Sequence, residues 1–415
     1  MAGNKKQIYL DNAATTRVDE EVFGIMKPYF CDKFGNASSA HALGREAREA
    51  VEKARSQAAE FLGCKAEEII FTSGATESNN LAIKGVISKG LRQAQGKSFL
   101  PHIITTKIEH HCVLDSCENL EKSGLAEVTY LPVNNEGIIE PEELKKAIRE
   151  NTILVSVMYA NNEIGTIQPI KELGKLLKEI NSKRSADKKI YFHTDAVQAA
   201  NYLDCDVNIL GADLLSFSAH KFYGPKGVGA LFIKKGTPVK KIQDGGAHES
   251  NLRAGTYNTA GIVGMGAAIQ RVISEKSKVK NIQNLRDKMI DAVLKIIPNS
   301  RLNGSREKRL PNNANFSFRG AEGEAVMMAL DAEGIAISTG SACASENLAP
   351  SHVLTAIGLG PEDSHTSIRV TLGRQTTEND IDDFVKILEK TLAHLRQISG
   401  MGGSAKKDLP ADFGC

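Results

Sequence analysis

Apolar and polar positions over residues 40–235 predict helices and strands in turn. Apolar side chains recur at steps of three and four over residues 47–61, and Gly63 follows, so a helix is predicted there. Short continuous apolar runs predict strands, at residues 69–71, 103–105, 153–157, 190–192, 213–218 and 228–233. Helices between such strands predict an α/β fold, with a mainly parallel sheet covered on both faces.

The pattern changes after about residue 265, where helices become longer and strands fewer. A strand is predicted at residues 367–370 and a last amphipathic helix at residues 379–398. We therefore predict a large domain over residues 16–264 and a smaller α+β domain made of residues 1–15 and 265–399. Residues 400–415 are small and polar, and we expect them to form a flexible tail.

The composition excludes several classes of protein. Of 415 residues, 41% are hydrophobic and 25% charged, and the net charge of +2 is too small for a typical nucleic-acid binder. We see no apolar run long enough to cross a bilayer and no signal region behind the first lysines. The seven cysteines are scattered without a Cys-x-x-Cys pair, which disfavours a disulfide framework or a zinc site. We expect a cytoplasmic protein with no metal, membrane or nucleic-acid partner.

Lys221 stands between a predicted strand and a rigid turn, in the sequence Ser-Ala-His-Lys-Phe-Tyr-Gly-Pro-Lys-Gly at residues 218–227. Burial of an amine at a strand end favours its neutral form, which is a nucleophile towards carbonyl groups. The hydroxyls of Ser216 and Ser218 alternate along the strand, close enough in sequence to bind an anionic group beside the amine. The pattern is typical of a lysine that forms a Schiff base with pyridoxal phosphate (PLP).

Two further segments offer partners for such a cofactor. Residues 72–77, Thr-Ser-Gly-Ala-Thr-Glu, join a strand to a helix and present backbone N–H groups to a phosphate, although such residues also cap ordinary helices. Asp195 follows a buried strand and precedes Lys221 by 26 residues. By itself Asp195 is typical of a helix N-cap, but beside the lysine motif it favours pairing with a pyridinium nitrogen.

His110 and Asn162 also follow predicted strands. A histidine there is able to stack on a cofactor ring and move protons, although a lone histidine is more often structural. The amide of Asn162 is able to bind a phenolic oxygen or to satisfy a turn. Because open α/β sheets bind ligands at the carboxyl ends of their strands, we expect His110, Asn162, Asp195 and Lys221 to lie around one crevice.

A separate segment, Ser-Thr-Gly-Ser-Ala-Cys at residues 338–343, displays Cys343 among small residues, and we expect an exposed loop over about residues 337–350. An exposed thiol is usually avoided unless it is used. Further on, Arg369 lies in a predicted strand and suits a bidentate contact with a substrate carboxylate, or else a surface ion pair.

These motifs together resemble those of the cysteine desulfurases of the NifS/IscS type, a class-V aminotransferase group within the aspartate-aminotransferase-like (fold type I) PLP enzymes. The resemblance runs from residue 9 to about residue 374, and the lysine motif paired with Ser-Thr-Gly-Ser-Ala-Cys is highly specific. It implies a large domain with a mainly parallel seven-stranded sheet, PLP as cofactor and L-cysteine as substrate. It also implies a homodimer that supplies sulfur to an iron–sulfur scaffold or another acceptor protein.

The resemblance also implies roles for single residues. Lys221 would be the Schiff-base lysine, Cys343 the nucleophile that carries the sulfur as a persulfide, and His110 a catalytic residue stacked on the cofactor ring. Asn36 and Arg369 would bind the substrate carboxylate. The remaining cofactor contacts would be made by Ala75, Thr76, Asn162, Asp195, Gln198, Ser218, His220 and, in the neighbouring subunit, Thr256.

The sequence departs from the family pattern in two places. Ala37 stands where relatives usually have proline after Gly-Asn, and Ser250 and Asn251 stand where they often have Arg-Gly, which leaves details of the contact between subunits open. Cys112 and Cys117 flank the histidine region, and we expect both to pack in the core. Selenocysteine lyase and, less favoured because of Cys343, a PLP aminotransferase are the alternative functions.

Overall fold

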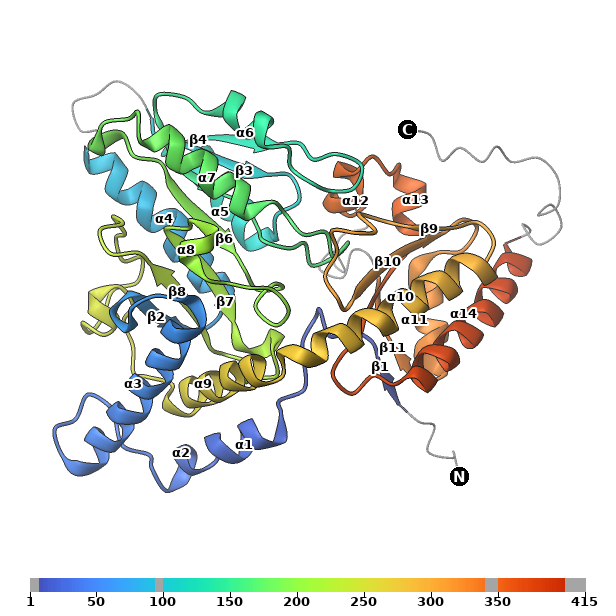
Figure 1. Ribbon diagram of the computed structural model, residues 1–415, viewed down its shortest axis with the longest axis horizontal. Coiled ribbons are helices and arrows are strands. Elements are labelled where there is room, and N and C mark those ends of the chain that lie inside the picture. Colours follow the sequence, from blue (N-terminus) through green and yellow to red (C-terminus); the bar gives the residue numbers. More distant parts are fainter. Residues whose placement is uncertain (1–6, 94–99, 340–349, 400–415) are drawn as a thin grey trace.

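The computed structural model describes residues 7–93, 100–339 and 350–399. Within them the chain forms a larger and a smaller unit that lie side by side (Figure 1). The proposed catalytic Cys343 and the predicted tail at residues 400–415 lie outside the described residues.

A seven-stranded sheet forms the centre of the larger unit. Its order is β2-β8-β7-β6-β5-β3-β4, in which only β8 runs antiparallel to its neighbours, as the predicted mainly parallel sheet requires. The strands are β2 (Ile69–Thr72), β3 (His102–Thr106), β4 (Glu127–Leu131), β5 (Thr152–Ser156), β6 (Tyr191–Asp195), β7 (Leu214–Ser218) and β8 (Gly229–Ile233). The short apolar runs thus marked six of the seven, and β4 was missed because its residues are only partly buried.

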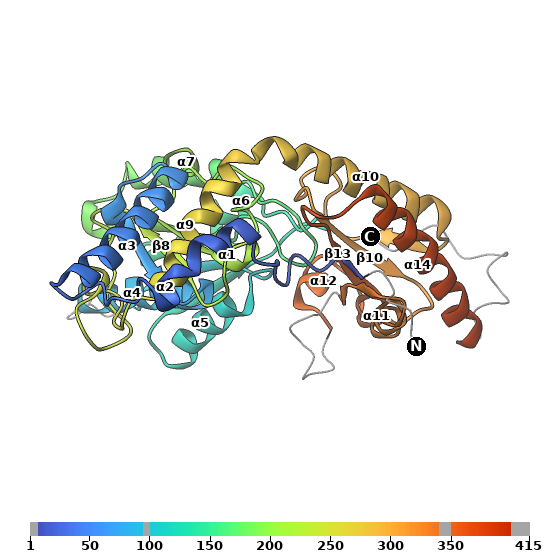
Figure 2. The same cartoon turned by 90° about the horizontal axis from the view of Figure 1, so that it is seen from below.

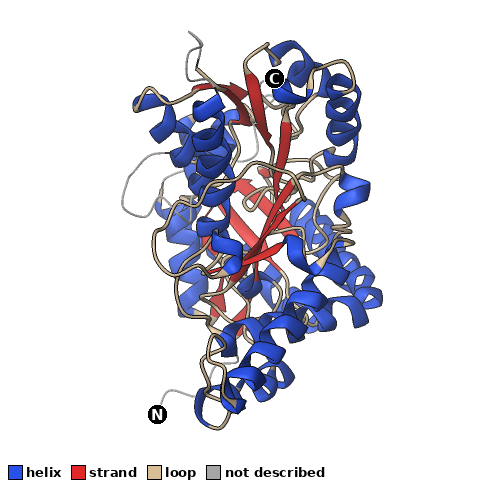
Figure 3. Cartoon of the chain, turned by 90° about the vertical axis from the view of Figure 1, so that its left-hand side faces the viewer, coloured by secondary structure: helices blue, strands red, loops and turns tan. Residues whose placement is uncertain are grey.

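Helices cover both faces of this sheet, because successive strand residues point to opposite faces (Figure 3). Ile103 and Leu214 pack in one apolar core with α4 and α5, whereas Ile104 and Leu215 pack in the other. The first face carries α4 (Ala75–Gln93) and α5 (His111–Lys122), and the second carries α3 (Ala42–Leu62), α6 (Pro141–Ala147), α7 (Ile170–Asn181), α8 (Val207–Leu210) and α9 (Thr259–Ser274). Gly63 ends α3, as predicted, and adopts the left-handed conformation there.

The smaller unit packs helices against a four-stranded antiparallel sheet of order β12-β13-β10-β9. Its core includes Phe316, Phe318 and Phe384. The strands are β9 (Ser300–Leu302), β10 (Asn313–Phe318), β12 (Ser338–Thr339) and β13 (Ser367–Thr371), and the helices are α10 (Val279–Ile296), α11 (Gly323–Ala332), α12 (His352–Ala356), α13 (Pro361–His365) and α14 (Glu378–Ile398).

The N-terminal segment joins the two units. β1 (Ile8–Tyr9) pairs with β11 (Ile335–Ala336) of the smaller unit, and α1 (Glu20–Met26) and α2 (Pro28–Cys31) then pack on α9 of the larger one. α9 packs against α3 of the larger unit, and α10 packs against α14 of the smaller unit. The chain therefore passes back from the larger unit to the smaller one between α9 and α10 (Figure 2). The predicted domain limit at residue 264 falls inside α9.

Candidate active site

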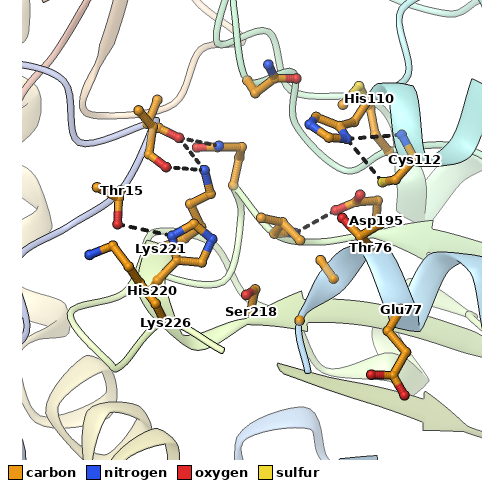
Figure 4. A pocket seen from close by; sticks show the side chains of 18 of the residues that line it. Thr15, Thr76, Glu77, His110, Cys112, Asp195, Ser218, His220, Lys221 and Lys226 are labelled. Carbon is orange, nitrogen blue, oxygen red and sulfur yellow. Dashed lines mark hydrogen bonds between the residues drawn. The ribbon is translucent and has the colours of Figure 1, made fainter. Parts of the chain in front are cut away.

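A cavity of about 600 Å³ opens at the carboxyl ends of β5, β6 and β7, between the two units (Figure 4). The sequence-predicted residues that line it come from six segments of the chain, and they are Ala75, Thr76, His110, Asn162, Asp195, Gln198, Ser218, His220, Lys221 and Arg369. The structure therefore brings most of the predicted site together around one crevice.

Lys221 lies at the end of the short helix Ala219–Lys221, directly after β7. Its Nζ atom donates to the carbonyl oxygens of Ala13 and Ala14, at 2.6 and 2.7 Å. The amide of Gln198 donates to the same Ala13 carbonyl, at 3.0 Å. The N-terminal segment thus fixes the position of the amine at one wall of the cavity.

Asp195 is the last residue of β6 and is buried. One of its oxygens accepts from the Val197 backbone N–H at 2.9 Å, and the other accepts from the Asn79 amide at 2.7 Å. Burial raises the pKa of this carboxyl, and hydrogen bonds and the nearby His110 and Lys221 oppose the rise. Asp195 therefore caps a turn, as its neighbours in the sequence favour, and also presents a buried acid to the cavity.

His110 is the N-cap residue of α5, four residues after β3 ends, rather than the end of the strand itself. Its Nδ1 atom accepts from the Cys112 backbone N–H at 3.2 Å and lies 3.1 Å from Cys112 Sγ. Burial lowers the pKa of the imidazole. The ring is therefore neutral near neutral pH, with Nε2 as its protonated nitrogen.

The loop between β2 and α4 forms another end of the cavity, where the first backbone N–H groups of α4 are exposed to a ligand. Ser218 lies beside this loop, since a Cβ atom on Gly74 would lie 3.8 Å from Ser218 Oγ. His220 also lines the cavity, and burial lowers its pKa to about 4. Gly74 of this loop touches Gly229, because a Cβ atom on Gly229 would lie 2.8 Å from Gly74 Cα. The backbone of the loop between β2 and α4 is thus in direct contact with the backbone of β8.

Arg369 of β13 is a buried residue rather than the partner of a surface ion pair. Its Nη2 atom contacts Asp11 Oδ1 at 3.0 Å and Ser338 Oγ at 3.1 Å, and its Nη1 atom donates to the Asn162 carbonyl at 3.2 Å. Its Nε atom is buried without a hydrogen-bond partner among the described residues. Arg369 lines the cavity, and its guanidinium suits an anionic group there.

Glu163 follows Asn162 and is fully enclosed behind the Arg369 wall. Burial raises the pKa of its carboxyl to about 7, although Ser351 and Arg369 act against the rise. The Ser351 hydroxyl donates to Glu163 Oε2 at 2.5 Å. Ser351 is the N-cap of α12, so this bond attaches the start of α12 to the cavity wall.

Two predicted residues lie outside the cavity, Asn36 and Thr256, and both are exposed. Their loops are joined by a hydrogen bond of 3.1 Å between Ser38 Oγ and His248 Nε2. The roles assigned to these two residues by resemblance stay predictions.

The loop that carries Thr256 is attached to the larger unit at two points, and one of them, Glu77, lines the cavity. Glu249 binds Arg55 at 2.6 Å and the Phe71 backbone N–H at 2.7 Å, and Arg253 binds Glu77 of the first turn of α4 at 2.9 Å. The departure at Ser250 and Asn251 lies between these points, where residues 249–251 all have positive φ angles. The cavity wall and the surface loop are therefore one connected structure.

The lining residues fit PLP. A phosphate matches the N–H groups of α4 and the hydroxyls of Thr76 and Ser218, and the buried acid Asp195 matches a protonated ring nitrogen. Lys221 supplies an amine at the opposite wall. Within the described residues, no group of three or more metal-ligating side chains is arranged to hold a metal ion.

Several residues of the site were missed from the sequence. Asn79, in the second turn of α4, donates to Asp195, and Lys226 lines the cavity from the predicted turn. Cys112 packs against the apolar core as expected but also lines the cavity, whereas Cys117 is buried in that core. The spacing between His110 and Cys112 was the available signal, since an N-cap side chain contacts the first turn of its helix.

Comparison with known proteins agrees with this geometry. The family model described as aminotransferase class-V matches residues 8–384. A curated cysteine desulfurase IscS of Dictyoglomus turgidum is 54% identical over 95% of this chain and 97% of its own length, and one of Methanosarcina thermophila is 48% identical over 95% and 94%.

Solved structures give the same result. A structure of a NifS-like protein superposes with a TM-score of 0.85 and 38% identity, over 94% of this chain and all of the other. A structure of SspA in complex with cysteine has a TM-score of 0.76 and 37% identity, over 88% of this chain and 99% of the other.

Proposed function

Because the chain belongs to the class-V aminotransferase family and is a cysteine desulfurase within it, we propose that it converts L-cysteine to L-alanine and transfers the sulfur to its own Cys343. The substrate C–S bond breaks and an S–S bond forms at Cys343. The carbon keeps the electron pair of the broken bond and takes up a proton, so the products are alanine and a persulfide. Atoms and electrons balance without a further oxidant or reductant.

One observation carries the proposal: Lys221 and Arg369 line the same cavity although 148 residues separate them in sequence. An α-amino acid needs a carbonyl group for its amine, which PLP held at Lys221 would supply, and an anion-binding group for its carboxylate. The guanidinium of Arg369 offers the second, and Asn36 is proposed to complete the carboxylate site.

PLP is the cofactor of this family, and when bound it provides an electron sink for the pair released at the substrate Cα. We propose that PLP binds to the cavity residues described above. Asp195 would stabilise the proton on the ring nitrogen, and Asn162 and Gln198 would bind the ring oxygen. The phosphate would be held by Ala75, Thr76, Ser218, His220 and, from the neighbouring subunit, Thr256.

Two residues of the chain would move protons. Lys221 removes the proton from Cα, since its amine is held at the cavity wall by the Ala13 and Ala14 carbonyls. His110 donates from Nε2 beside the sulfur, because its Nδ1 is occupied by Cys112. Both groups act at a fixed place because backbone atoms hold them.

A homodimer is proposed because Thr256 and Asn36 are exposed, as residues of a shared site would be in one isolated subunit. Three large aromatic side chains that precede Asn36 in the sequence are also exposed: Phe23, Phe30 and Phe34 are 56%, 60% and 65% exposed. Such apolar exposure favours burial against another protein surface.

The sulfur acceptor is proposed to be an iron–sulfur scaffold or another carrier protein in the cytoplasm. Relatives that share about half of the sequence carry the IscS name. In the part of the chain that the structure describes, none of the helices has the length and apolar composition needed to cross a bilayer.

Mass spectrometry tests the proposal directly. After incubation of the full-length holoenzyme with L-cysteine, we expect one added sulfur on the peptide that contains Cys343, with release of alanine. Cys343→Ser should abolish both, whereas Cys31→Ser, which removes an exposed thiol elsewhere, should change neither. Normal sulfide production by Cys343→Ser would disprove the assignment of Cys343, and turnover of selenocysteine alone would favour the lyase alternative.

A further inference from the structure

Cys112 lies in the first turn of α5 and lines the active-site cavity, although it takes no part in the proposed chemistry. Its Sγ atom is 3.1 Å from His110 Nδ1. Burial raises the pKa of the thiol to about 12, so the sulfur keeps its proton near neutral pH. A protonated thiol is a hydrogen-bond donor, and Nδ1 of a neutral imidazole is the matching acceptor.

Asn79 contacts this thiol from the other side. Its Nδ2 atom donates to Cys112 Sγ at 3.0 Å and, with its second hydrogen, to Asp195 Oδ2 at 2.7 Å. Asn79 is fully buried in α4, so the amide cannot exchange these partners for water. A continuous chain of hydrogen bonds therefore runs from Asp195 through Asn79 and Cys112 to His110.

This chain determines which nitrogen of His110 carries the proton. Nδ1 accepts from the Cys112 backbone N–H, and this contact is lost if Nδ1 becomes protonated. The thiol sulfur already accepts from Asn79, so its own hydrogen is the one available for the contact with Nδ1. The remaining nitrogen, Nε2, points away from Cys112 and towards the inside of the cavity (Figure 4). Neutral His110 thus presents a donor to a bound substrate rather than an acceptor.

We propose that Asn79 and Cys112 are positioning residues that hold His110 in the Nε2–H tautomer and link its orientation to Asp195. This inference rests on the proposed function, because the tautomer matters for catalysis only if His110 donates a proton beside the substrate sulfur. The bonds themselves involve only side chains of this chain. The other charged and titratable groups around His110 are Lys221, His111, Asp115, Glu109 and His352.

Ring-labelled histidine NMR of the full-length protein, with and without PLP, tests this directly. The chain has ten histidines, and the spectrum of His110→Gln identifies the His110 signals. In the parent protein we expect the nitrogen shifts of the Nε2–H tautomer. Cys112→Ala should raise the titration midpoint of His110 by about half a pH unit or more, because one bond that stabilises the neutral ring is lost.

Two variants separate the bond from simple packing. Cys112→Ser keeps a donor at the same place and should return the His110 midpoint most of the way to the parent value. Cys117→Ala removes a buried cysteine from the same helix without touching the cavity, and should leave the His110 signals unchanged. Equal shifts in the Ala and Ser variants of Cys112, or no shift in either, would overturn the proposal.

Asn79→Ala tests the second link. Because Asn79 acts on His110 through Cys112, its effect on the His110 midpoint should largely vanish in the Cys112→Ala background, and fully additive shifts would contradict the chain. In turnover assays Cys112→Ala should lower kcat several-fold and leave KM for cysteine nearly unchanged. If the NMR results hold but no alanine forms from cysteine in the parent, the proposed function fails and the hydrogen-bond chain stands.

Discussion

The cavity wall and the surface loops that carry Asn36 and Thr256 differ in how completely a single chain builds them. In the wall, Asp195 and Lys221 have partners from distant segments of the same chain, and His110 contacts Cys112, which Asn79 of another helix contacts in turn. In the surface loops, the Asn36 side chain accepts from the Ser38 backbone N–H of its own loop, and both Asn36 and Thr256 are exposed. Residues assigned to proton and electron chemistry are thus positioned within one chain, and two residues assigned to ligand binding await a second surface.

This difference suggests a division of roles. Proton transfer requires positions accurate to a fraction of an ångström, which buried backbone and side-chain contacts provide. Contacts to a phosphate or a carboxylate tolerate more variation, so they are the contacts that a subunit interface is able to supply. Each prediction below tests one side of this comparison, from the largest expected effect to the smallest.

Replacement of Lys221 tests the interior. We expect Lys221→Ala to lower the rate of alanine formation by at least about 10³-fold, since both the amine that binds the cofactor and the proton acceptor are lost. Lys226→Ala, on the same turn, keeps both functions and should stay within about tenfold of the parent. Alanine assays with matched PLP content measure both, and similar losses in the two variants would contradict the role of Lys221.

Glu163 tests how much a buried carboxyl group in the cavity wall lowers the stability of the fold. Its folded-state pKa of about 7 lies above the ordinary value of 4.5, so the stability it contributes is present below pH 4.5 and is lost as pH rises through 7. Relative to the parent, Glu163→Gln should therefore gain stability between pH 5 and pH 8, by up to about 3 kcal/mol. Urea unfolding of the cofactor-free protein at both pH values measures this.

Glu77 binds Arg253 of the surface loop, and it serves as a control because its pKa is shifted in the opposite direction to that of Glu163. Burial alone would raise its pKa, but hydrogen bonds from Arg253 and the Ser73 backbone N–H lower it. Its stabilising contribution is thus present above the ordinary pKa and is lost as pH falls. Glu77→Gln should be less stable than the parent at pH 8, and the same pH trend in both glutamine variants would refute the comparison.

Thr256 tests the surface side. Thr256→Val should weaken PLP binding by about tenfold, the value of roughly one hydrogen bond. If Thr256 serves the neighbouring subunit, mixed dimers of Thr256→Val and Lys221→Ala contain one complete site, and half of the sites should bind PLP with the parent affinity. Recovery should be absent if Thr256 serves its own subunit, and spectrophotometric PLP titration of the mixed dimers decides between the two.

Much of the larger unit was predictable because its strands are buried on both faces and read as unbroken apolar runs. β7 was predicted nearly to the residue, and Lys221 follows it as expected, whereas the apolar run at residues 190–192 marks only the first part of β6, which ends at Asp195. β9 to β12 were not predicted, because they are short and, in β10, carry asparagines and serines inside a buried strand. The length of these strands and the alternation of their apolar and polar residues therefore give little indication of where they lie.

The contacts between helices were beyond sequence reasoning. Asn79 and Cys112 lie on different helices, and only the packing of α4 on α5 brings them together beside Asp195. Arg369 was found from its strand context, but its buried pairing with Asp11 depends on the N-terminal segment that joins the two units. Such pairs are properties of the tertiary arrangement and leave no local pattern.

The contact between Gly74 and Gly229 has a consequence for which cofactors the site accepts. It fixes the backbone of the phosphate loop against the backbone of β8, which pairs with β7, without an intervening side chain. The Lys221 amine is in turn held by two carbonyl oxygens. A site whose two anchor points are both held in place favours a rigid ligand of one length, so we expect a shorter or longer pyridine aldehyde to bind more weakly than PLP.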